Sequence, residues 1–183
     1  MVVFDTTIAL LFLRPGTNPP LDPATGAPIQ HAEARIALLV ETLGNARTRI
    51  IIPTPVMSEL LIYAGAGTAE LVTRLTRSAT FRVVPFDTRA AVELAVMTRA
   101  ALEQGDKRGG VDAPWNKIKF DRQIVAIAKV AGVTAIYSDD RQLRAFAEQQ
   151  GLRVIGLADL PLPREPELPL PPPSEPPDAG AEA

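Results

Sequence analysis

The chain alternates short, wholly apolar segments with stretches in which apolar residues recur every three or four positions. The first kind of segment predicts strands and the second predicts helices. Strands that are apolar at every position are typical of a parallel sheet buried on both faces. The pattern therefore predicts an α/β fold with three α/β/α layers and a mostly parallel central sheet of about five short strands. The predicted strands are residues 2–4, 50–52, 81–84, 134–137 and 152–155, and the predicted helices are residues 6–13, 31–43, 55–63, 68–76, 88–104, 120–131 and 140–149.

Three regions interrupt this alternation and are rich in proline, glycine and polar residues. Residues 14–30 and 105–119 are predicted to be loops. Residues 161–183 hold half of the 18 prolines, and proline cannot join helix or sheet ladders because it lacks the backbone N–H. We therefore expect one folded domain over residues 1–160, followed by a proline-rich, acidic and disordered tail over residues 161–183.

The charge of the chain is unevenly distributed. The formal net charge is −2, which at first argues against a nucleic-acid partner. The tail holds five acidic residues and one basic residue, so it carries −4 and residues 1–160 carry +2. This mild positive charge neither requires nor excludes RNA binding. No apolar run approaches the roughly eighteen residues of a membrane span, and residues 1–13 lack the basic start of a signal peptide. We therefore expect a cytoplasmic protein.

The residue types available restrict the metals that the chain can bind. There is no cysteine, and His31 is the single histidine. Zinc sites usually need cysteine or histidine ligands. A metal ion must therefore be held by oxygen atoms, which favours magnesium, manganese or calcium.

Four acidic residues are candidates for a site at one edge of the predicted sheet. Asp5 and Asp140 follow the first and fourth predicted strands, and sites in open α/β sheets form beyond the carboxyl ends of strands. Glu59 lies in the first turns of the helix after the second strand, within the apolar run PVMSELLIY. Asp121 lies in the first turn of the helix before the fourth strand. Because that helix ends at the opposite edge, we expect Asp121 to join the others only if its helix is displaced or tilted.

Each acid has a simpler structural explanation. Asp5 and Asp140 could be helix N-caps, and Glu59 and Asp121 could complement the helix dipole from a first turn. Taken together, clustered and partly buried carboxylates repel one another and are costly to keep ionised. A divalent cation would offset that cost, so the four acids are candidates for a metal site.

Four short motifs carry a family resemblance. They are FDTT at 4–7, PVMSEL at 55–60, KFDRQIVAIA at 119–128 and YSDD at 137–140. In this order and on these predicted elements, they resemble the PIN-domain ribonucleases, most closely the VapC-type toxins of bacterial toxin–antitoxin pairs. The resemblance covers about residues 1–160. It implies that the catalytic and metal-binding acids are Asp5, Glu59, Asp121 and Asp140.

The resemblance also assigns secondary positions. Ser138 stands where the family has the threonine of a T-x-D turn, and the spacing favours Asp140 over the adjacent Asp139 as the ligand. Thr7 fills a small polar position two residues after the first acid. Departures from the family pattern are Leu143, where an aromatic residue is common, the long insertion at 14–30 and the tail.

The family implies hydrolysis of an RNA phosphodiester bond with Mg²⁺ or Mn²⁺ as cofactor, a homodimer, and a cognate antitoxin that neutralises the enzyme. Residues on or beside the glycine-rich segment before Asp121 are candidates to contact RNA phosphates or to stack on a base. A solvent-exposed loop with no such role is an equally good interpretation. The candidate RNA-binding residues are Lys107, Arg108, Trp115, Lys117 and Lys119.

Two other functions use similar residues. A phosphoaspartate phosphatase needs D-x-D after the first strand, whereas this chain has Asp5-Thr6-Thr7. A receiver domain needs adjacent acids after the first strand and a lysine late in the sheet, and neither is evident. A catalytically silent PIN-like module that binds RNA or protein is a further alternative, although the presence of all four acids argues against it.

Overall fold

The five strands form one parallel sheet, as the sequence predicts. The computed structural model describes residues 1–103, 105–106, 108 and 113–163. The strands follow the order β3-β2-β1-β4-β5, and every neighbouring pair is parallel. All residues of β1, β2 and β4 are buried, which explains why these strands are apolar throughout. The strands are β1 (Val2–Phe4), β2 (Ile50–Pro53), β3 (Phe81–Val84), β4 (Ala135–Tyr137) and β5 (Val154–Ile155).

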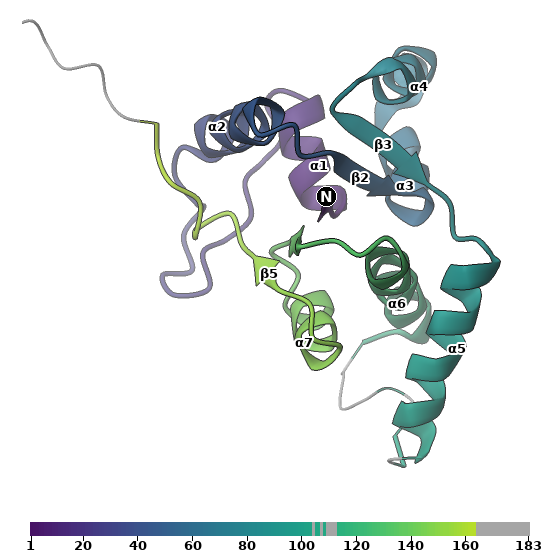
Figure 1. The fold of residues 1–183 in the computed structure, drawn as a ribbon. Helices are drawn as coiled ribbons and strands as arrows, with labels where there is room; N and C mark the ends of the chain where they lie inside the picture. The colour runs from purple at the N-terminus through teal and green to yellow at the C-terminus, as the bar shows by residue number, and fades with distance from the viewer. Residues whose placement is uncertain (104, 107, 109–112, 164–183) are drawn as a thin grey trace, which may run out of the picture.

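Helices cover both faces of this sheet, which confirms the predicted layers (Figure 1). The helices α1 to α4 lie on one side, and α6 and α7 lie on the other. The helices are α1 (Thr6–Leu13), α2 (Ala32–Asn45), α3 (Thr54–Ala64), α4 (Thr68–Arg77), α5 (Thr88–Glu103), α6 (Trp115–Val130) and α7 (Arg141–Gln149), with a short 3₁₀ turn at Gly65–Gly67. None of these helices is long and apolar enough to cross a membrane.

The start of α6 is where the sequence-based prediction is wrong. The helix begins at Trp115, five residues before the predicted start at residue 120. The predicted loop at 105–119 is therefore shorter, and residues 104, 107 and 109–112 lie outside the described part of the chain. The predicted inward position of Phe120 is also wrong, because this side chain is 41% exposed. Ile118 and Arg122 occupy the buried side of the helix instead.

The strand order creates a crevice between β1 and β4. The chain leaves β1 toward the helices on one face and leaves β4 toward α7 on the other face (Figure 1). Connections that diverge in this way open a space beyond the carboxyl ends of the two strands, where α/β proteins bind ligands. Asp5 directly follows β1, and Asp140 lies three residues beyond the end of β4. The fold therefore places both residues at this crevice.

Candidate active site

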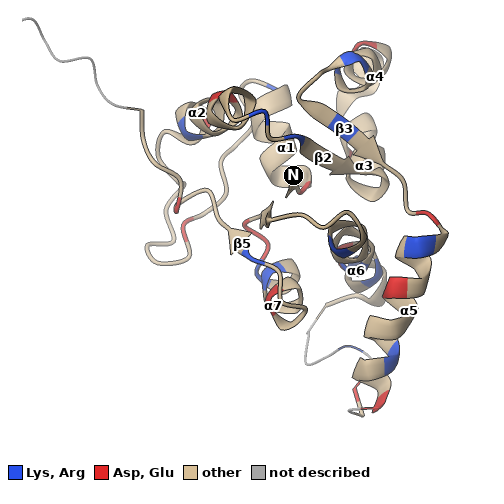
Figure 2. Ribbon diagram, in the orientation of Figure 1, with Lys and Arg blue, Asp and Glu red and all other residues tan. Residues whose placement is uncertain are grey.

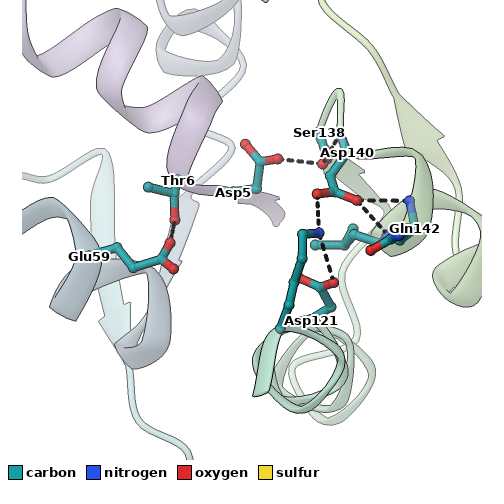
Figure 3. Close-up of polar contacts among 9 residues, drawn as sticks. Asp5, Thr6, Glu59, Asp121, Ser138, Asp140 and Gln142 are labelled. Carbon is teal, nitrogen blue, oxygen red and sulfur yellow. Dashed lines mark hydrogen bonds and ion pairs between the residues drawn. The ribbon is translucent and has the colours of Figure 1, made fainter. Parts of the chain in front are cut away.

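The four acids predicted from the sequence line one cleft of about 570 Å³ at this crevice. They come from the ends of β1 and β4 and from the helices α3 and α6. Figure 3 shows Glu59 on one side of the cleft, Asp121 and Asp140 on the other, and Asp5 between them. The other residues that line the cleft are Thr6, Thr7, Leu10, Ile62, Tyr63, Asn116, Lys117, Phe120, Ile124 and Leu143.

Asp5 is the most buried of the four acids, with 4% of its surface exposed. It is the N-cap of α1, because its Oδ1 accepts a hydrogen bond from the backbone N–H of Ile8 at 2.9 Å. The hydroxyl of Ser138 donates to its Oδ2. Burial raises the pKa of the Asp5 carboxyl to about 7, and the two hydrogen bonds only partly oppose this effect. The capping interpretation is therefore correct for Asp5, yet a cap alone does not require such deep burial.

Glu59 is held by a neighbouring hydroxyl group. It lies in the second turn of α3 rather than the first, so the helix-dipole explanation does not apply. The hydroxyl of Thr6 donates a hydrogen bond to its Oε2 (Figure 3). Thr7, the candidate predicted from the sequence, also lines the cleft, whereas Thr6 was not predicted. The FDTT motif offers two adjacent hydroxyls, and only the start of α1 at Thr6 determines which one faces Glu59.

Asp121 and Asp140 share one cation, the side-chain ammonium of Lys117. Lys117 Nζ lies 3.3 Å from Asp121 Oδ2 and also pairs with Asp140 Oδ2. Asp121 is in the second turn of α6, so it is not a first-turn acid. Lys117, in the first turn of α6, pairs with Asp140, so the start of this helix lies at the cleft. Asp121 therefore reaches the cleft from the correct edge of the sheet.

Burial and the neighbouring charges shift the pKa values of Asp121, Asp140 and Lys117 in opposite directions. Burial raises the pKa of Asp121 to about 6, although Lys117 opposes this. Burial would also raise the pKa of Asp140, but its bond to Lys117 and its backbone hydrogen bonds outweigh burial and lower it. Burial would lower the pKa of Lys117, and the two carboxylates outweigh burial and raise it. The ammonium therefore remains charged between its two partners.

Asp140 and Asp139 face different parts of the molecule. Asp140 is the N-cap of α7, where its Oδ1 accepts from the N–H groups of Gln142 and Leu143 at 2.8 and 3.1 Å. The Oδ1 of Asp139 instead accepts from the N–H of Leu157 at 2.9 Å, in the segment after β5. Asp140 lines the cleft and Asp139 does not. This arrangement agrees with the preference for Asp140 as the ligand.

Ser138 connects the two sides of the crevice. It is fully buried, donates to Asp5 and accepts a hydrogen bond from the backbone N–H of Asp140 at 3.0 Å. One hydroxyl thus fixes the end of β1 relative to the start of α7.

Of the candidate RNA-binding residues that the structure describes, only Lys117 lines the cleft. Lys119 is exposed on the same helix but does not line it. The ring of Trp115 packs against the buried guanidinium of Arg122 at 5.6 Å, which places it in a cation–π contact. Arg108 lines a separate small cavity, and Lys107 lies outside the described residues.

The surface charge is mixed rather than strongly basic. The helices α2, α5 and α7 each carry both acidic and basic positions (Figure 2). A broad phosphate-binding face is therefore not evident on these helices. The cleft itself is acidic, because four carboxylates and one basic residue, Lys117, line it.

The side chains of the cleft fit a hard divalent cation by their chemistry. The four acids and the hydroxyls of Thr6 and Thr7 offer oxygen atoms, the ligands that Mg²⁺ and Mn²⁺ favour. The space between Asp121 and Asp140 already accommodates a positive charge, that of Lys117. Among the side chains that the structure describes, no three acids are close enough to form a metal centre without rearrangement.

The fold and the cleft together define a class: an α/β protein with a five-stranded parallel sheet and an acidic cleft where the connections diverge. The sequence profile of the PIN domain family matches residues 27–149, and the chain belongs to that family. Glu59, Asp121 and Asp140 lie within the matched segment, whereas Asp5 lies before it. Its place in the cleft is therefore an independent structural observation.

Solved structures share this fold at low sequence identity. A chain of FitAB bound to the IR36 DNA fragment has a TM-score of 0.57 and 18% identity, and the match covers 88% of this chain and 98% of that one. A chain of DNA-bound VapBC from Salmonella typhimurium has a TM-score of 0.51 and 18% identity, covering 85% and 97%. A chain of VapBC2 from Rickettsia felis, bound to a DNA fragment from their promoter, has a TM-score of 0.52 and 14% identity, covering 85% and 98%. No curated protein sequence gives a significant match.

Proposed function

We propose that this chain is a metal-dependent endoribonuclease that hydrolyses RNA phosphodiester bonds. The observation that carries the proposal is the convergence of four carboxylates, from four separate elements, on one cleft at the divergence of β1 and β4. Capping and strand pairing account for the positions of Asp5 and Asp140, but neither explains why Glu59 and Asp121 line the same cleft. Membership of the PIN domain family adds support.

In this proposal Asp5, Asp121 and Asp140 hold Mg²⁺ or Mn²⁺, and Glu59 is a further ligand or orients the attacking water. A bound divalent cation would make a water molecule more acidic and offset charge at the phosphorus atom. Ser138 fixes the direction of Asp5, and Thr6 fixes the direction of Glu59. Asp5 and Asp121 have little contact with solvent, and the lower local dielectric strengthens their interaction with any cation that enters the cleft.

A nuclease assay separates this proposal from its alternatives. The wild-type protein is incubated with single-stranded RNA in Mg²⁺, in Mn²⁺ and in excess EDTA, with Asp121→Asn as the matched inactive variant. We expect cleavage that requires metal and Asp121. Metal-dependent release of phosphate from small esters, without RNA cleavage, would instead indicate a phosphatase. RNA binding without cleavage in any metal would indicate a silent binding module.

We also propose that the biological role is that of a toxin neutralised by a cognate antitoxin, and that the protein is a homodimer in the cytoplasm. The sequence resembles VapC-type toxins, and the similar solved chains come from complexes named FitAB and VapBC. Expression of the wild-type chain should stop growth of a bacterial host, whereas Asp121→Asn should not. Equal growth of both strains would refute the toxin role.

The boundary of the folded domain is proposed to lie near residue 160. Leu157 and Leu160 are buried, and Arg35 of α2 donates hydrogen bonds to the backbone carbonyls of Ala158 and Leu160. These contacts fasten the chain to the domain up to this point. The tail predicted at 161–183 lies outside the described residues from 164 onward. Removal of residues 164–183 should leave the melting temperature unchanged.

A further inference from the structure

Lys117 holds the same carboxylate oxygens that a metal ion would need. The Oδ1 of Asp140 is engaged in capping α7, so Oδ2 is its remaining ligand atom. That Oδ2 pairs with Lys117 Nζ, and Asp121 Oδ2 lies 3.3 Å from the same nitrogen. Magnesium binds carboxylate oxygens at about 2.0–2.1 Å. An ion bound to both Oδ2 atoms would therefore overlap the position of the ammonium group.

The position of Lys117 on its helix indicates that the carboxylates keep it there. Lys117 is the third residue of α6, in the first turn. The positive end of the helix dipole disfavours a cation in a first turn. The two carboxylates offset this unfavourable position, and in return the ammonium relieves the repulsion between them. Lys117 is thus a counterion for the acids rather than a residue that stabilises its own helix.

The exposure of the three side chains indicates which of them can move. The side chain of Lys117 is 42% exposed, whereas Asp121 and Asp140 are 15% and 32% exposed. A lysine side chain is long and flexible, and its ammonium is readily solvated. Asp140 is additionally fixed by its cap to α7. The ammonium can therefore leave for solvent while the carboxylates stay in place.

We propose that Lys117 is an internal counterion that competes with the divalent cation for Asp121 and Asp140, so that metal binding requires its displacement. This inference rests on the proposed metal-dependent function, and it adds a residue that regulates metal binding. In the metal-free protein, Lys117 pairs with both acids. In the metal-bound protein, the ammonium no longer pairs with these two carboxylates.

The competition is measured as Mn²⁺ affinity, which does not depend on RNA cleavage. Titration of wild type, Lys117→Met, Lys117→Arg and Lys119→Met with Mn²⁺, followed by the electron paramagnetic resonance signal of the free ion, gives each dissociation constant. We expect Lys117→Met to bind Mn²⁺ about 5- to 10-fold more tightly, the effect of losing two partly exposed ion pairs. Lys117→Arg keeps the cation and should remain close to wild type.

Lys119→Met is the matched control. It removes the same charge from the same helix two residues away, and Lys119 is an exposed side chain that does not line the cleft. General loss of positive charge would tighten Mn²⁺ binding equally in both methionine variants, whereas specific competition tightens it only in Lys117→Met. A double variant, Lys117→Met with Asp121→Asn, should lose the gain and so locate the ion at this site.

The outcomes separate the inference from the function on which it rests. If wild type and Lys117→Met bind Mn²⁺ equally, or the variant binds more weakly, the competition is refuted while the metal site remains. If neither protein binds Mn²⁺ at millimolar concentration, both the inference and the metal-dependent function fail. Melting temperatures in EDTA and in Mn²⁺ provide a second measurement, and the increase caused by Mn²⁺ should be larger for Lys117→Met than for wild type.

Discussion

The cleft contains two pairs of acids that are held in different ways. Asp5 and Glu59 are bound by the neutral hydroxyls of Ser138 and Thr6, whereas Asp121 and Asp140 share the cation of Lys117. A hydroxyl fixes the direction of a carboxylate but leaves its charge uncompensated. A lysine compensates the charge with a group that is able to leave. The first pair therefore provides a fixed part of the site, and the second pair provides a part whose charge can be exchanged.

The largest expected effect comes from removing charge at the fixed pair. Asp5→Asn keeps an oxygen that can cap α1, because asparagine is also a good N-cap. It removes the carboxylate closest to the carboxyl end of β1. We expect RNA cleavage in Mg²⁺ to fall at least about 100-fold, with little change in the melting temperature. An Asp5→Asn protein that cleaves RNA at the wild-type rate would remove Asp5 from the site.

The next effect concerns the hydroxyl that holds Asp5. Ser138→Ala leaves a buried carboxylate oxygen and the N–H of Asp140 without their shared partner. We expect urea denaturation to show a free energy of unfolding lower by about 1–3 kcal/mol. Ser58→Ala is the control, because Ser58 bonds only to the carbonyl of Pro55 within its own helix. Equal losses of unfolding free energy in both variants would show that the buried hydrogen bond to Asp5 contributes no more to stability than the bond made by Ser58.

A double-mutant cycle tests the lysine-held pair. Lys117→Met, Asp140→Asn and the double variant are compared by urea denaturation in EDTA. Because the Lys117 and Asp140 side chains are 42% and 32% exposed, solvent screens the pair and the coupling should be about 0.5–1 kcal/mol. The corresponding cycle for Thr6→Val and Glu59→Gln should give a smaller coupling, since no charged pair is involved. A larger coupling for the threonine pair would reverse the distinction between the two halves of the cleft.

The smallest effect on RNA cleavage is expected for a change at Asp139, which adjoins Asp140 but does not line the cleft. Asp139→Asn removes a carboxylate beside Asp140, but its Oδ1 faces Leu157 rather than the cleft, and asparagine can still accept that hydrogen bond. Cleavage of RNA should change by no more than about 2-fold, or ~0.4 kcal/mol in activation free energy. A loss comparable to that of Asp140→Asn would mean that Asp139 is the working acid.

Much of this arrangement could be predicted from the sequence because burial leaves a clear pattern. The strands β1, β2 and β4 are buried at every position, so their apolar runs are unambiguous. Asp5 directly follows β1, and Asp140 lies three residues after β4. Their positions indicated that the site lies at the carboxyl edge of the sheet. Parallel pairing then brings residues at that edge together, whatever their separation in the sequence.

The start of α6 and its consequences could not be predicted in the same way. Its first turn is polar and partly exposed, and Ile118 is its first fully buried residue, so the apolar periodicity begins late. The glycine-rich segment before it favoured a loop. Arg122 also occupies the buried side of the helix through contacts with the rings of Trp115 and Phe146, a use of arginine that periodicity does not indicate. Lys117 lies in this first turn, so its bridge between Asp121 and Asp140 could not be predicted either.

The position of the first strand has a consequence for synthesis of the protein. β1 is the middle strand of the sheet, and Asp5 bonds to Ser138 across 133 positions of sequence. Until residues 135–137 of β4 have been synthesised, the amino-terminal strand has at most one of its two neighbours available. The acids then remain dispersed, so an unfinished polypeptide lacks an assembled cleft until almost the entire domain has emerged.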